Sequence, residues 1–181
     1  MIAPHEISEV FYQADRLDQR QLDWLRDRGV TTHALTEPDP VLTARVAFTK
    51  TGTFDVVSVD EEGVRALLIL CHGVVGEPND IAAWRPRTGN IGMWLGRAGL
   101  IGEDEILQPR LGAPLRIFRE PLWWLKSGRR GAIIINARRA ADLLSGISLQ
   151  AEDANHAAEL RRLLTRPAPK ITWSAKAEAA A

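Results

Sequence analysis

The chain contains only one cysteine, Cys71, among its 181 residues. A single cysteine excludes an internal disulfide and a cysteine-based metal cluster, and it is typical of proteins in a reducing compartment. The first ten residues, MIAPHEISEV, lack the basic and apolar regions of a signal peptide. The longest apolar run, near residue 70, is much shorter than the roughly 20 residues of a membrane-spanning helix. The sequence therefore predicts a soluble, cytoplasmic protein with no membrane contact.

The sequence also lacks net charge, because 23 lysines and arginines balance 23 aspartates and glutamates. This balance argues against a protein whose whole surface binds polyanions, but it is compatible with a local basic patch. With 45% apolar and 25% charged residues, the composition is that of an ordinary globular protein. A length of 181 residues suits one domain with a small additional N-terminal unit.

Signatures of most enzyme classes are missing as well. No glycine-rich loop precedes Lys-Ser or Lys-Thr, so a P-loop is absent, and there is no Gly-x-Ser-x-Gly nucleophile motif. The glycines of GNIGMWLG (89–96) do not join a clear strand to a clear helix, as a dinucleotide-binding motif would. The four histidines are not spaced as metal ligands. No motif therefore identifies an enzyme.

Two helices are predicted at the N-terminus. Apolar residues keep helical spacing over residues 7–14 and again over 22–25. Asp18 is placed as the N-cap of the second helix, and Gly29 as the glycine that ends it. The two prolines of TEPDP (36–40) predict a loop.

From residue 44 the apolar period changes to two, which predicts strands. Residues 44–71 are predicted as three strands with turns at 51–52 and 62–63, and 80–86 as a fourth strand closed by a proline. These strands would form an antiparallel meander. The segment IGMWLGRAGLIG (91–102) is predicted to be a short helix with loops.

After residue 114 strands and helices alternate. Strands are predicted at 114–120, 131–136 and 147–153, and helices at 121–128, 137–146 and 154–165. The short links indicate a small, mostly parallel sheet covered by helices. We therefore expect an α/β (or α+β) fold with N-terminal helices, an antiparallel meander and a C-terminal βαβαβα unit. Its parts would be a helical segment (1–40), one α/β domain (41–173) and a disordered tail (174–181).

Three carboxylates follow strands of this predicted sheet. Glu120 ends one strand, and Glu152 and Asp153 end another. Because ligands bind at the carboxyl ends of parallel strands and Mg²⁺ prefers oxygen ligands, these three residues could hold a Mg²⁺ ion. The alternative is that Glu152 or Asp153 caps the helix at 154–164. No other cofactor is predicted.

The order of the segments WLRDRGV, VVSVDEEG, RIFREPLWWL and LQAEDANHAAELRRLL resembles that of Toprim-type primase-like proteins of phages and plasmids. The resemblance implies Mg²⁺-dependent phosphodiester or nucleotidyl chemistry, with Glu120 matching the family's glutamate and Asp153 the first aspartate of its Asp-x-Asp motif. Pro121 stands where the family has glycine, and Asn155 where it has the second aspartate. These departures imply a relative that binds without catalysis.

A second resemblance concerns the C-terminal half. PLWWLKSGRRGAIIIN (121–136) and LLTRPAPKI (163–171) are similar to a group of prophage-encoded proteins of alphaproteobacteria to which no activity is assigned. This similarity implies an origin on a mobile element.

The stretch from 116 to 139 combines positive charge with two adjacent tryptophans, Trp123 and Trp124. One acid, Glu120, opposes seven basic residues, which are Arg116, Arg119, Lys126, Arg129, Arg130, Arg138 and Arg139. Such a local excess is a pattern that phosphate groups bind. Neighbouring helical residues point about 100° apart, so one tryptophan is predicted in the core and the other at the surface, where it could stack on a base or anchor a protein partner. The alternative is that both pack between helix and sheet, with the arginines as a solvated rim.

From these patterns we predict a non-catalytic accessory protein of a phage or other mobile element. It would bind nucleic acid, or a complex that handles nucleic acid, through these nine basic and tryptophan residues. One alternative is a Mg²⁺-dependent Toprim-like enzyme that uses Glu120, Glu152 and Asp153. The other is a phage protein that binds another protein, as a structural component or an inhibitor of host defence.

Overall fold

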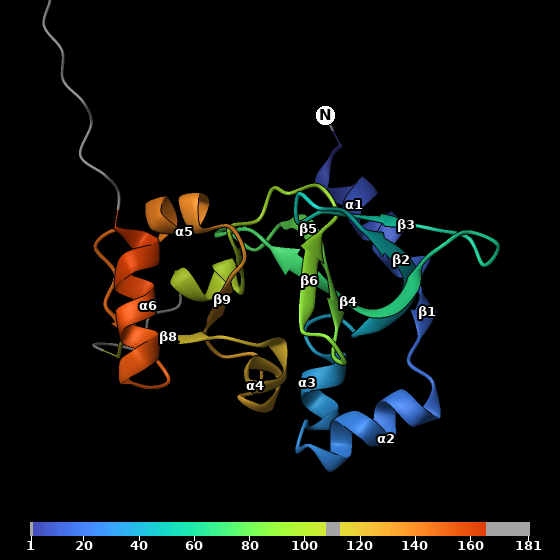
Figure 1. The fold of residues 1–181 in the computed structure, drawn as a ribbon, viewed down its shortest axis with the longest axis horizontal. Helices are drawn as coiled ribbons and strands as arrows, with labels where there is room; N and C mark the ends of the chain where they lie inside the picture. Colours follow the sequence, from blue (N-terminus) through green and yellow to red (C-terminus); the bar gives the residue numbers. More distant parts are fainter. Residues whose placement is uncertain (1, 108–112, 166–181) are drawn as a thin grey trace, which may run out of the picture.

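The computed structural model describes residues 2–107 and 113–165, which form two β-sheets and the helices around them (Figure 1). The helices are α1 (Pro4–Tyr12), α2 (Gln19–Asp27), α3 (Thr32–Thr36), α4 (Pro121–Lys126), α5 (Ala137–Leu143), α6 (Ala154–Leu164) and the 3₁₀ helix η1 (Glu103–Ile106). The strands are β1 (Asp15–Arg16), β2 (Leu42–Phe48), β3 (Phe54–Val56), β4 (Val64–His72), β5 (Pro78–Arg85), β6 (Asn90–Met93), β7 (Leu100–Ile101), β8 (Leu115–Phe118), β9 (Ala132–Ile134) and β10 (Leu149–Gln150). The predicted α/β class is confirmed.

The first sheet is antiparallel, with the strand order β1-β2-β4-β5-β6 and with β3 also paired to β2. At β4 both faces of this sheet are buried. Residues 66 to 71 are all apolar and buried, and successive residues of a strand point to opposite faces. The odd-numbered residues from 67 to 71 lie in the core that contains residues of α2, α3 and α4. The even-numbered residues from 66 to 70 lie in the core that contains α1. The predicted antiparallel sheet is confirmed, but it is not a simple meander. β4, β5 and β6 pair in chain order, whereas β3 pairs with β2 and β4 also pairs with β2.

The second sheet has the strand order β10-β8-β9-β7. β8 pairs in parallel with β10 and with β9, whereas β7 pairs antiparallel with β9. The predicted small, mostly parallel sheet is therefore confirmed. The chain passes from β8 to the neighbouring β9 and then back past β8 to β10. Because such parallel connections are normally right-handed, helices on two moves in opposite directions are expected on opposite faces of the sheet. Accordingly, α4 contributes to the core shared with the first sheet, and α5 and α6 contribute to a separate core.

The predicted short helix at 91–102 is wrong, because this segment contains the strand β6 and the strand β7 instead. Two buried carboxylates explain why the backbone between β6 and β7 is not helical. Asp80 accepts hydrogen bonds from the backbone N–H groups of 81, 95, 97 and 98, and Glu103 accepts from those of 99 and 100. A backbone that donates to side chains in this way cannot also make the hydrogen bonds of a helix. Burial raises the pKa of Glu103 above its ordinary value.

The N-terminal helices are packed into the same cores as the rest of the chain. Ile7 and Phe11 of α1 are fully buried against one face of the first sheet, and Leu25 of α2 is fully buried against the other. As predicted, Asp18 caps α2, in a capping box with Gln21, and Gly29 follows the helix with a φ of 83°. The predicted tail, 174–181, lies outside the described residues. Among the described helices, none is long and apolar enough to cross a membrane.

Candidate functional site

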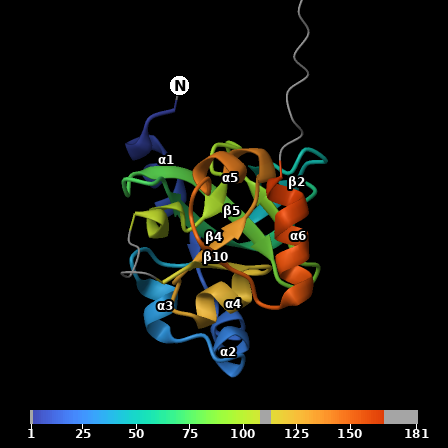
Figure 2. The same ribbon diagram turned by 90° about the vertical axis from the view of Figure 1, so that its left-hand side faces the viewer.

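The nine residues predicted to bind nucleic acid do not form one surface. α4 and α5, which hold or adjoin most of them, lie on opposite sides of the second sheet, with α4 below it and α5 above it in both views (Figures 1 and 2). Arg138 and Arg139 lie on α5, where Arg139 Nη1 donates to the carbonyl of Arg97. Arg116 lies on β8, with its guanidinium 4.9 Å from the centre of the Phe118 ring. The predicted surface is therefore divided between α4 and the region of α5.

The two adjacent tryptophans have different environments, as their angular separation on a helix predicts. Trp124 is 4% exposed, and its Nε1 donates to the carbonyl of Gly131 at 2.9 Å. Trp123 is 49% exposed, and the Nζ of Lys126 lies 4.3 Å from its ring centre. Trp123 is thus available for contact with another molecule, and Trp124 is a core residue.

Arg129 is buried, which corrects its prediction as a surface residue. Its Nε donates to the carbonyl of Ala34, and its Nη2 to the carbonyl of Asp39, each at 2.8 Å. Its guanidinium also lies 5.6 Å from the ring centre of Trp124. Burial lowers the pKa of Arg129 to about 10. Arg129 therefore ties the loop between α3 and β2 to the chain that follows α4.

The same loop carries a buried carboxylate that binds two side chains. Tyr12 donates its hydroxyl to Asp39 Oδ1 at 2.5 Å, and His72 Nε2 lies 2.6 Å from Asp39 Oδ2. His72 Nδ1 lies 2.8 Å from the carbonyl oxygen of Gly76, which can only accept, so Nδ1 donates. A proton must then lie between Nε2 and Asp39. Because both ring nitrogens of His72 are occupied, this histidine is not free to act as a general base.

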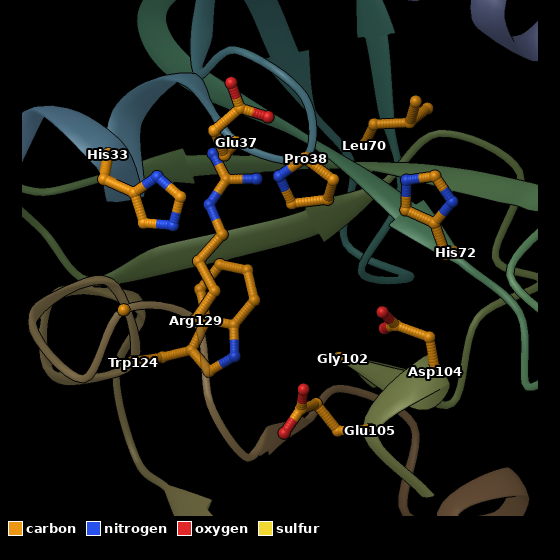
Figure 3. Close-up of a pocket in the computed structure, with 11 residues that line it drawn as sticks. His33, Glu37, Pro38, Leu70, His72, Gly102, Asp104, Glu105, Trp124 and Arg129 are labelled. Atoms are coloured by element: carbon orange, nitrogen blue, oxygen red, sulfur yellow. The ribbon is translucent and has the colours of Figure 1, made fainter. Parts of the chain in front are cut away.

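A cavity of about 330 Å³ lies beside these groups (Figure 3). It is formed where the first sheet meets η1, α4 and the loop after α3, and it is lined by His33, Glu37, Pro38, Leu70, His72, Gly102, Asp104, Glu105, Trp124, Gly128 and Arg129. An adjoining cavity of about 480 Å³ shares Pro38, His72 and Asp104 with it. These residues come from distant parts of the sequence, and no local pattern would have grouped them.

A second tryptophan–cation pair adjoins the first. On α2, the guanidinium carbon of Arg28 lies 4.0 Å from the ring centre of Trp24, which packs against Trp84 at a centre-to-centre distance of 6.3 Å. A methyl group on Gly29, at the end of α2, would lie 3.5 Å from Cε of Lys126. Figure 2 shows α2 and α4 together at the lower end of the molecule. We call Trp24, Arg28, Trp123 and Lys126 the α2–α4 surface.

The α2 half of this surface was not predicted from the sequence. Trp24 and Arg28 are four residues apart, which places them on one side of a helix, and this spacing could have indicated their contact. Their proximity to α4 depends on the packing of the two helices and leaves no pattern in the sequence.

Two of the three predicted carboxylates, Glu152 and Asp153, lie together, and Arg119, which follows β8, pairs with both. Arg119 Nη1 lies 2.7 Å from Asp153 Oδ2 and 3.4 Å from Glu152 Oε2, and its Nε lies 3.3 Å from Glu159. Asp153 also accepts from the backbone N–H of His156 and so caps α6, which confirms the alternative reading. The Arg119 guanidinium lowers the pKa of Asp153 well below its usual range. Glu120 is exposed at the N-cap position of α4 and makes no side-chain capping bond.

Within residues 2–107 and 113–165, no group of three or more His, Cys, Asp or Glu side chains is placed to hold a metal ion. The predicted Mg²⁺ site of Glu120, Glu152 and Asp153 is therefore replaced by an arginine–carboxylate cluster. No family model, curated protein or solved structure matches the chain. The resemblances to Toprim-type and prophage-encoded proteins stay predictions.

Replacement of Arg129 by alanine should lower the free energy of unfolding by about 3 kcal/mol. The variant loses two hydrogen bonds from a charged donor, each contributing about 1.5 kcal/mol, and leaves both carbonyl groups without that donor. Urea unfolding followed by tryptophan fluorescence measures the change. Arg130→Ala, at the exposed neighbouring residue, is the matched control and should change stability by less than about 0.5 kcal/mol. Equal effects of the two variants would contradict a stabilising role for the buried guanidinium.

The ionisation of Tyr12 reports on its hydrogen bond to Asp39. Tyr12 is the only tyrosine, so near-ultraviolet absorbance follows this one group, and its pKa should be about 12 instead of the ordinary 10.0. Because the folded-state pKa is raised, the contribution to stability is complete below pH 10 and is lost as the pH rises through about 12. Asp39→Asn should move the midpoint towards 10, whereas Glu37→Gln in the same loop should not. Circular dichroism at each pH checks that the protein stays folded, and a midpoint near 10 in the folded parent would refute the contact.

The role of Asp153 can be separated into capping and charge. Asparagine is as good an N-cap as aspartate, so Asp153→Asn should lower the melting temperature less than Asp153→Ala. The lowered pKa predicts a stability contribution that is present above the ordinary pKa of 3.8 and lost as the pH falls, and this dependence should be weaker in both variants. Mg²⁺ should leave all three melting temperatures unchanged. A Mg²⁺-dependent rise that disappears in Asp153→Asn would instead establish the metal site.

Proposed function

We propose that the protein binds single-stranded nucleic acid through the α2–α4 surface. The observation that carries this proposal is the exposed indole of Trp123 with Lys126 over its ring. A second tryptophan–cation pair, Trp24 and Arg28, lies at the end of α2 that adjoins Lys126. Sequence-tolerant binding of single strands commonly combines aromatic side chains, on which bases stack, with positive charges that contact the backbone.

The geometry favours single strands over duplexes. In a duplex the faces of the bases are covered by their neighbours, so an indole on a helix has no base face to contact unless a base is unstacked. The α2–α4 surface also lacks the dense positive charge that sequence-independent duplex binding requires, since it contributes two cations. Binding is therefore expected to depend mainly on stacking and less on salt.

Fluorescence anisotropy with labelled oligo(dT), oligo(U) and a random duplex tests the proposal. Trp123→Ala should weaken binding of the single strands by about 1–3 kcal/mol, or roughly 5- to 150-fold, and Trp123→Phe should weaken it less because a ring remains. Two phosphate contacts predict a salt dependence, d log K/d log [salt], of about −1.4. The duplex should bind more weakly than either single strand.

The matched charge variants are Lys126→Gln on α4 and Arg162→Gln on the exposed side of α6. We expect the first to weaken binding and the second to leave it unchanged. Equal losses of affinity in the two variants would mean that nucleic acid is attracted non-specifically to positive charge on the protein. If none of the three nucleic acids binds, the proposal is refuted, and a protein partner for the exposed tryptophan is favoured instead.

A further inference from the structure

The cavity beside Arg129 presents opposite charges that face each other without meeting. Arg129, Asp104 and Glu105 all line this cavity, yet among the described residues no carboxylate oxygen lies within 4.0 Å of the Arg129 guanidinium. Figure 3 shows Arg129 on one side of the space, with Asp104 and Glu105 on the other. A space therefore separates this cation from Asp104 and Glu105, and a third acid, Glu37, also lines the cavity.

On both sides of this space, polar side-chain groups have hydrogen-bonding capacity that no described residue uses. Arg129 is 8% exposed, and its Nε and Nη2 are bound to backbone carbonyls, but no described residue accepts from its Nη1. Buried nitrogen and oxygen atoms of the described side chains all have partners, so Nη1, which has none, is not fully buried, and Arg129 lines the cavity. Across it, Glu105 uses one oxygen, Oε2, to accept from Gly131, and Asp104 makes no hydrogen bond within the described chain.

The backbone conformation of Arg129 is a second, independent observation that points to a ligand-binding role for this side chain. Arg129 has a φ of 63°, and it is the one described residue other than glycine with a positive φ. A left-handed conformation is unfavourable for a residue with a Cβ, and glycine would avoid this cost. Strained residues of this kind occur often at ligand-binding sites.

We propose that this cavity binds a small zwitterion of the α-amino-acid class. The ligand's carboxylate would accept from Nη1 of Arg129, and its ammonium group would donate to Asp104 and to Oε1 of Glu105. A simple anion would face the three acids of the lining, Glu37, Asp104 and Glu105, and a simple cation would face a buried guanidinium, whereas a molecule with both charges can pair with both. The volume of about 330 Å³ lies at the lower end of the range for small-molecule sites. Leu70 and Pro38 supply apolar contact for a side chain.

The carboxylate of Asp39 is not part of this binding set, although it is close. Its two oxygens are already occupied by Tyr12 and His72. We therefore infer that Asp39 supports the cavity wall, and that Arg129, Asp104 and Glu105 bind the ligand.

Isothermal titration calorimetry with each of the 20 L-amino acids tests the proposal on the intact protein. At least one should bind with a stoichiometry of one to one. Its methyl ester, which lacks the carboxylate, and its N-acetyl derivative, which lacks the ammonium group, should each bind at least about tenfold more weakly, as expected for loss of a charge-assisted hydrogen bond. These derivatives test both contacts without altering the protein.

Two protein variants complete the experiment. Asp104→Asn should weaken binding of the same amino acid at least about tenfold, and Asp60→Asn, at an exposed turn far along the chain, should leave it unchanged. The proposal is overturned if no amino acid binds, if the ester binds as well as the free acid, or if Asp104→Asn and Asp60→Asn behave alike. The oligonucleotide titrations concern a different surface, so neither result decides the other.

Discussion

The buried guanidinium of Arg129 joins segments that are 90 and 95 residues apart in the sequence. By binding the carbonyls of Ala34 and Asp39, it fixes the loop that leads from α3 into the first sheet. That loop in turn holds the Asp39 carboxylate, which Tyr12 of α1 and His72 of β4 both contact. A buried charge is costly unless hydrogen bonds replace its hydration, and here backbone carbonyls do so. Residues of this arrangement also form the cavities, since Pro38 and His72 line both of them.

The chain after α4 is shaped by the same requirement. Gly128, Arg129 and Gly131 all have positive φ angles, which reverse the chain tightly between α4 and β9. At Gly131 a Cβ would lie 2.4 Å from the carbonyl oxygen of Arg116, so only glycine fits. Two glycines thus allow the turn, and the arginine between them adopts a strained conformation because its contacts outweigh the strain.

Local features of the sequence predicted local structure, and contacts between distant segments were beyond them. The capping residue Asp18 and the apolar run of β4 were correctly interpreted because the forces that act on them are local. Arg129 and Arg130 are adjacent and chemically identical, yet one is buried and the other exposed, and carbonyl groups far along the chain make the difference. Similarly, the glycine-rich stretch at 91–102 was interpreted as helix because the effect of Asp80 on its backbone is visible only in three dimensions. The strand order β10-β8-β9, which separates α4 from α5, has no local signature either.

The edge-on pair of Trp24 and Trp84 has an optical consequence. Their ring planes are inclined by 61° at a centre-to-centre distance of 6.3 Å, and one ring belongs to α2 while the other belongs to β5. Two indoles held so close and at a fixed angle couple their electronic transitions, and this coupling gives a circular dichroism signal with paired bands of opposite sign. The signal exists only while α2 is docked on the first sheet. The protein therefore contains an intrinsic spectroscopic reporter of helix docking, which needs no added label.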